Sequence, residues 1–183
     1  MIVLLSNYRV GSSTFIKELS AQTNKKYQLE FTGEYLHPEA SARYRRPSED
    51  IEIYKIMPDQ IQPGFDDEFC LDYLAKAQEI IYLLRKNFTE QVLSQTVCDL
   101  TGEWHPDTMS NTPRDISVGI TEFKKNEIIL LRNLESQSNF YKRYPGKIIY
   151  LEDRYDTEQK YKSKSNVLNH DELKSTINVQ EYF

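Results

Sequence analysis

The sequence predicts an α/β protein of three layers, in which helices flank a central parallel sheet of four to five strands. Short apolar runs, such as residues 2–5 and 79–84, are each followed by a polar turn and then by a helical pattern, which is typical of βα units. The chain also has 183 residues, which suits one domain on a prior of roughly 100 to 200 residues. We therefore expect a single domain over 1–183, with residues 152–183 as a polar C-terminal extension.

Each strand is predicted from a short run of β-branched, aliphatic or aromatic residues that stops at a turn. The run at 51–57 alternates in character and stops at Pro58, which cannot donate to a sheet hydrogen bond. The run at 147–151 follows Pro145 and Gly146, which end the preceding helix. The predicted strands are 2–5, 28–31, 51–57, 79–84 and 147–151.

Helices are predicted where apolar residues recur at spacings of three and four. Phe15, Ile16 and Leu19 share one face after the turn at Gly11. The longest pattern lies between residues 120 and 141 and predicts an amphipathic helix. Its expected apolar face consists of Ile120, Phe123, Ile128, Leu131 and Leu134. The predicted helices are 12–22, 66–76, 89–100 and 120–141.

Charge, hydropathy and cysteine content disfavour several classes of protein. The chain carries 23 basic and 28 acidic residues, a formal net charge of −5, so we expect no nucleic-acid polymer as a partner. No apolar run approaches the roughly 18 residues that span a bilayer, and the apolar start at 1–5 is too short for a signal-peptide core. These features favour a cytoplasmic protein without a membrane span. Cys70 and Cys98 lie far apart, so neither a zinc site nor a disulfide framework is predicted.

The turn between the first strand and the first helix is the most informative segment. A small-residue turn into a helix directs backbone N–H groups and the positive end of the helix dipole at one spot. The sequence therefore predicts a site for phosphate or a similar anion, in which a guanidinium adds positive charge and hydroxyls add donors. Its residues are Arg9, Gly11, Ser12, Ser13 and Thr14. A turn with a simple helix cap is the alternative interpretation.

Two common nucleotide motifs are missing from this turn. It has no G-x-x-x-x-G-K-[ST] sequence, which argues against a nucleoside triphosphatase, and no G-x-G-x-x-G sequence, which argues against a Rossmann dehydrogenase.

Three segments resemble motifs of the sulfotransferases that use 3′-phosphoadenosine 5′-phosphosulfate (PAPS). Residues 9–13, Arg-Val-Gly-Ser-Ser, resemble the R-x-G-[ST]-[ST] loop that binds the 5′-phosphosulfate. The strand that ends at Arg85, followed by a helix with Ser94, resembles the 3′-phosphate motif. Lys86 is an alternative to Arg85, because Arg85 precedes Ser94 by nine residues and Lys86 precedes it by eight. Residues 32–38 resemble the segment with the proposed general base in the bacterial trehalose sulfotransferase type.

The resemblance covers residues 2–153 and implies a P-loop NTPase-like sulfotransferase fold without a metal ion. It implies PAPS as the donor and a hydroxyl of a carbohydrate, glycolipid or other small molecule as the acceptor. Glu34 would be the general base, Arg9 would stabilise the leaving phosphate, and Lys55 would touch the sulfonate. Lys55 and Met57 stand where cytosolic enzymes of the family carry Lys-x-His, so that second route to a base is missing.

Two other classes of function remain open from the sequence. One is a module of the same fold that binds a nucleotide or a protein partner without catalysis, which Met57 and the short C-terminus favour. The other is a small-molecule kinase of the P-loop class, which the missing Gly-Lys-[ST] opposes.

Overall fold

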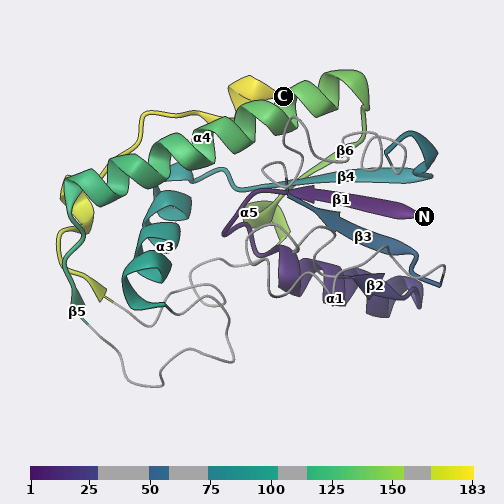
Figure 1. Ribbon diagram of the computed structural model, residues 1–183, viewed down its shortest axis with the longest axis horizontal. Coiled ribbons are helices and arrows are strands. Elements are labelled where there is room, and N and C mark those ends of the chain that lie inside the picture. The colour runs from purple at the N-terminus through teal and green to yellow at the C-terminus, as the bar shows by residue number, and fades with distance from the viewer. Residues whose placement is uncertain (29–49, 58–73, 103–114, 155–165) are drawn as a thin grey trace, which may run out of the picture.

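The computed structural model describes residues 1–28, 50–57, 74–102, 115–154 and 166–183. Within them, five parallel strands form one sheet with helices on both faces (Figure 1), so the predicted α/β class and parallel sheet are confirmed. The strands are β1 (Ile2–Ser6), β2 (Tyr27–Gln28), β3 (Ile53–Ile56), β4 (Glu79–Leu84) and β6 (Lys147–Tyr150). Their spatial order is β2-β3-β1-β4-β6.

The connections of the sheet diverge between β1 and β4, which are neighbours in register from Ile2↔Glu79 to Ser6↔Leu83. From β1 the chain passes through α1 (Ser12–Thr23) to β2 at one edge. From β4 it passes through α3 (Phe88–Thr101) and α4 (Ile120–Arg143) to β6 at the other edge. In open parallel sheets, ligands bind beyond the carboxyl ends of two strands whose connections diverge in this way. The topology therefore indicates a ligand site at the segments that follow β1 and β4.

Side chains alternate along the strands between two apolar cores, as the pleat requires. On one face, Leu4 and Leu83 pack with Phe15 and Ile16 of α1. On the other, Leu5 and its neighbours pack against the C-terminal half of α4. α1 and α4 thus form the two outer layers of the structure (Figure 1).

α4 buries a different face from the one that the apolar pattern predicts. Phe123 and Leu134 are buried as expected, but Ile120 and Ile128 are 57% and 51% exposed. Among the buried positions are several polar side chains, Asn126, Asn133, Gln137 and Ser138. The prediction failed because three of these polar residues find partners inside: Asn126 bonds Thr96, Ser138 bonds the Tyr182 carbonyl, and the Asn133 amide donates to Asn7 Oδ1 at 3.2 Å. In the described part of the chain, no helix is long and apolar enough to cross a membrane.

The C-terminal segment (residues 166–183) packs against α3 and α4. Its strand β7 (Asn166–Val167) pairs with β5 (Asp115–Ile116), and two short 3₁₀ helices follow, His170–Glu172 and Val179–Tyr182. Leu173 and Val179 are buried in a third cluster with side chains of α3 and α4. The segment carries few apolar residues: Leu168 is exposed, whereas Leu173 and Val179 contribute to this core.

Several predicted boundaries shift by a few residues. β3 is shorter than the predicted 51–57, and Leu151 begins a short helix, α5 (Leu151–Arg154), instead of ending the last strand. β2 covers only the start of the predicted 28–31, and residues 29–31 lie outside the described part. Of the predicted helix 66–76, residues 74–76 are helical and the rest lies outside the described part, as does Cys70.

His170 links the C-terminal segment to the first turn of α3. Its Nε2 lies 2.5 Å from Glu90 Oε1, and its Nδ1 lies 3.6 Å from Asp171 Oδ1. Nearby, the backbone N–H of Ser175 donates to Thr89 Oγ1 at 2.9 Å. The hydrogen bond to Glu90 raises the pKa of His170, and burial opposes this in part. The protonated imidazole is therefore the form that holds the segment on α3.

Raising the pH from about 5.5 to about 8.5 should lower the unfolding free energy of the wild type more than that of His170→Gln. The reason is that the folded pKa lies above the unfolded value of about 6.5. The stabilisation is thus complete below about pH 6.5 and disappears as the pH rises through the folded pKa. Urea unfolding across this pH range measures the effect. Parallel pH curves for the two proteins would contradict the role of the ion pair.

Candidate functional site

The loop between β1 and α1 (the first loop, residues 7–11) contains two residues in the left-handed backbone region. Gly11 has φ 68°, and Arg9 has φ 59°. This conformation costs a residue with a side chain about 1–2 kcal/mol. Such a residue persists only where its surroundings hold it, and strained residues of this kind cluster at functional sites. The contacts of Arg9 therefore show what the loop is built around.

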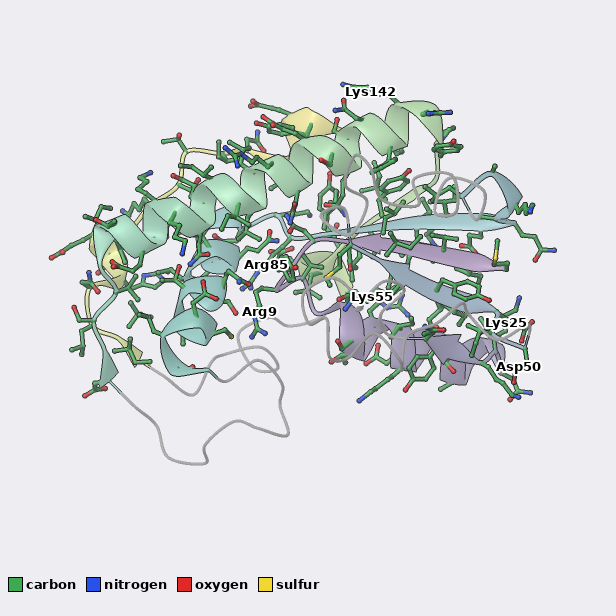
Figure 2. The ribbon with its side chains drawn as sticks, in the orientation of Figure 1. Arg9, Lys25, Asp50, Lys55, Arg85 and Lys142 are labelled. Atoms are coloured by element: carbon green, nitrogen blue, oxygen red, sulfur yellow. The ribbon has the colours of Figure 1, made fainter. Side chains whose placement is uncertain are left out.

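Three hydrogen bonds join the first loop to Arg85 and to α3, in the chain that follows β4. The Arg85 guanidinium donates through Nη1 to the backbone oxygen of Arg9 at 3.4 Å. Arg9 donates through Nε to Ser94 Oγ of α3 at 3.0 Å. Gln91, one turn earlier on α3, donates to the Tyr8 backbone oxygen at 2.6 Å. Figure 2 shows Arg9 and Arg85 side by side beyond the carboxyl ends of the strands. The structure thus joins Arg9, Arg85 and Ser94, which the sequence assigned to two different motifs.

The N-terminus of α1 faces this region and lacks a side-chain cap. Gly11 is the N-cap residue, and the first helical bond runs from Phe15 N to Gly11 O at 3.0 Å. The amides of Ser12, Ser13 and Thr14 consequently have no intrahelical acceptor. α3 differs, because Asn87 Oδ1 caps the Glu90 amide. The turn into α1 therefore offers donors and a helix dipole to an anion.

Arg85 is buried at the centre of the site. It is 8% exposed, and within the described residues its Nε has no hydrogen-bond partner. Burial lowers the pKa of Arg85, the carboxylates of Glu152 and Glu90 oppose that shift, and Arg9 adds to it. Because an arginine remains protonated in proteins, the site contains a poorly solvated positive charge next to a second arginine.

Lys86 lies on the outer side of the same turn. Its Nζ bonds the Asp153 carboxylate and lies 5.2 Å from the centroid of the Tyr150 ring. The sequence left Arg85 and Lys86 as alternatives for one phosphate. The contact between Arg85 and the Arg9 loop favours Arg85 for that role.

Lys55 is buried in β3, only 5% exposed, and pairs in register with Leu4 of β1. The pleat places it on the same face as Ile53, which packs with α1. Figure 2 places Lys55 toward the carboxyl edge, on the side of α1. The structure therefore brings its charge to the side of the sheet that α1 covers.

Glu34 and the whole segment 32–38 lie outside the described residues. Sequence reasoning also missed two residues that the structure places at the site, Gln91 and Glu152. Gln91 precedes Ser94 by three residues on the same helix, a spacing that puts both on one face. Glu152 follows β6 at the carboxyl edge, where open parallel sheets bind their ligands.

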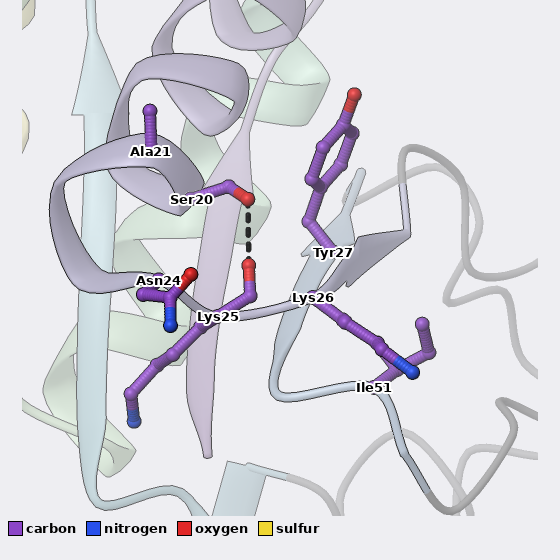
Figure 3. Close-up of a pocket in the computed structure, with 7 residues that line it drawn as sticks. All are labelled: Ser20, Ala21, Asn24, Lys25, Lys26, Tyr27 and Ile51. Carbon is purple, nitrogen blue, oxygen red and sulfur yellow. Dashed lines mark hydrogen bonds between the residues drawn. The ribbon is translucent and has the colours of Figure 1, made fainter.

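A hollow of about 470 Å³ lies at the opposite end of the sheet (Figure 3). It is lined in part by Asn24, Lys25 and Tyr27. Its lysines already have carboxylate neighbours: Lys26 Nζ lies 2.6 Å from Asp50, and Lys25 Nζ lies 3.8 Å from Glu52. We therefore place the candidate site at the carboxyl edge, where the strained loop and the buried arginine meet.

The scan against protein-family models finds no match to this chain, and the search of curated proteins finds none either. Within the described ranges, no group of three His, Cys, Asp or Glu side chains is placed to hold a metal ion. The geometry of the site, with two arginines, a serine and a helix N-terminus, suits an oxyanion.

Gln91→Leu should destabilise the protein by about 1 kcal/mol, because it removes the hydrogen bond from Gln91 to the Tyr8 carbonyl. Gln95→Leu is the matched control on the same helix. Gln95 is also buried, its Oε1 has no partner among the described residues, and its amide nitrogen donates to Asp99 Oδ1 at 3.4 Å. Its replacement should be close to neutral or stabilising. Urea unfolding measures both, and equal losses would contradict the bracing role of Gln91.

Proposed function

We propose that this protein is a sulfotransferase that binds PAPS at the carboxyl edge of its sheet, with a P-loop NTPase-like sulfotransferase fold. The observation that carries the proposal is the meeting of Arg9, Arg85 and Ser94 beside the uncapped N-terminus of α1. The three side chains belong to the two motifs that resemble the donor site of this class, and they converge where parallel sheets bind their ligands.

The charges and donors of the site support a ligand with several anionic groups. Arg9 and Arg85 supply two guanidinium groups, which bind phosphate oxygens with directed pairs of hydrogen bonds. Ser94 accepts from Arg9, so its own hydroxyl hydrogen can be donated to a ligand oxygen. The buried Nε of Arg85, which has no hydrogen-bond partner in the described part of the chain, fits a site that an anion completes.

In the proposed reaction, the acceptor hydroxyl oxygen attacks the sulfur of PAPS in line. The new O–S bond forms while the bond between sulfur and the 5′-phosphate oxygen breaks, and adenosine 3′,5′-bisphosphate leaves. Arg9 and the amides at the start of α1 would stabilise the charge that develops on the leaving oxygen. Lys55 would add to that stabilisation from β3. Binding of the 3′-phosphate by Arg85 and Ser94 would fix the position of the donor.

Glu34 is the proposed general base and would take the proton of the acceptor hydroxyl. General-base catalysis of this kind contributes about 10²- to 10⁴-fold to a rate. The assignment rests on the resemblance of residues 32–38. The acceptor class, a carbohydrate or another small molecule with a hydroxyl, rests on the same resemblance.

A second candidate function is nucleotide binding without transfer. Met57, which is buried just after β3, favours this candidate. It stands where cytosolic sulfotransferases carry a histidine, and a thioether cannot take the proton of the acceptor hydroxyl. Binding of adenosine 3′,5′-bisphosphate with no turnover of PAPS on any acceptor would support this candidate over the enzyme.

Calorimetric titration with adenosine 3′,5′-bisphosphate in the absence of Mg²⁺ tests the donor site. The wild type should bind, and Arg85→Met should weaken binding by about ten- to hundredfold, because a charge-assisted hydrogen bond contributes about 1.5–3 kcal/mol. Lys86→Met is the matched control: it removes the same charge from the adjacent, outward-facing residue and should change the affinity by less than about threefold.

Equal losses in the two variants would contradict the assignment of Arg85. A wild type that fails to bind the bisphosphate but binds Mg²⁺-ATP would contradict the proposal itself and favour a kinase.

A further inference from the structure

Glu152 binds the turn between β4 and α3 through its carboxylate, next to the buried Arg85. It is the second residue of α5, which follows β6 at the carboxyl edge of the sheet. Its carboxylate accepts the backbone N–H of Lys86 at 2.9 Å and that of Asn87 at 3.0 Å. Glu152 Oε1, which accepts from Asn87, also lies 3.8 Å from Arg85 Nε. Two successive amides and a guanidinium are the kind of donor set that binds an oxyanion.

The carboxylate compensates the charge of Arg85 only partly. Charge-assisted N–H···O bonds measure about 2.7–2.9 Å, and the separation here is 3.8 Å. Arg85 Nε accordingly has no hydrogen-bond partner among the described residues, while Nη1 donates to Arg9 O. The guanidinium thus lies between an internal anion on one side and the first loop on the other, with both edges poorly solvated.

We propose that Glu152 is the internal counter-anion of the Arg9–Arg85 site and that it weakens the binding of anionic ligands there. A bound oxyanion and the Glu152 carboxylate carry the same charge and compete for one guanidinium. The ligand class is an oxyanion of the phosphate type. That this anion belongs to adenosine 3′,5′-bisphosphate, whose release Glu152 would then ease, rests on the proposed function.

Glu152→Gln tests the inference, because it keeps the size of the side chain and an oxygen acceptor while removing the charge. Asp153→Asn is the matched control: it removes one negative charge from the next residue, whose carboxylate bonds Lys86 on the exposed side. Inorganic pyrophosphate and adenosine 3′,5′-bisphosphate are titrated separately into each protein. Glu152→Gln should bind pyrophosphate about five- to tenfold more tightly than the wild type, and Asp153→Asn by less than about twofold.

The gain must also depend on Arg85. In an Arg85→Met background, Glu152→Gln should add no affinity, because the two residues then no longer interact. Glu152→Asp provides a second variant if the glutamine protein is poorly folded; its shorter side chain should give a smaller gain in the same direction. A merely structural role of Glu152 predicts the opposite, since a disordered turn binds more weakly.

An affinity of Glu152→Gln equal to or below that of the wild type overturns the inference, as does the absence of pyrophosphate binding in every protein. A gain for pyrophosphate, together with no binding of the bisphosphate by any protein, supports the inference and overturns the proposed function.

Discussion

The buried guanidinium of Arg85 is the interaction on which the rest of the site depends. Arg85 follows β4, donates to the Arg9 carbonyl after β1, and faces the Glu152 carboxylate after β6. One side chain therefore connects the carboxyl ends of three strands. A charge that is 8% exposed is costly without partners. The Arg9 carbonyl and the Glu152 carboxylate compensate part of this cost, which explains the strained conformation of Arg9 and the position of α5. An oxyanion at this point would complete what the protein supplies only in part.

α3 connects the C-terminal segment to this site. One of its faces carries Gln91 and Ser94, which bond the first loop. Its first turn bonds the C-terminal segment through Glu90 and Thr89. The C-terminal segment lies outside the resemblance to sulfotransferases, yet its apolar residues complete the core between α3 and α4. The C-terminal segment therefore stabilises α3, whose side chains bond the first loop.

Local pattern was enough to predict the sheet and the long helix, because each depends on a run of neighbouring residues. The face of α4 was not predictable in this way, since Asn133 is buried only because Asn7 lies opposite it. The contact between Arg9 and Ser94 joins residues 85 positions apart. It forms because β1 and β4 are neighbours in the sheet. Glu152 was missed for the same reason: its role depends on β6 lying beside β4.

Amide NMR during titration with adenosine 3′,5′-bisphosphate without Mg²⁺ tests the central claim most directly. If the carboxyl edge binds the nucleotide, the amide signals of Ser12, Ser13 and Thr14 and the Nε signals of Arg9 and Arg85 should shift together with one dissociation constant. Shifts confined to the hollow beside Lys25 at the opposite end of the sheet, or no shifts at all, would contradict the claim.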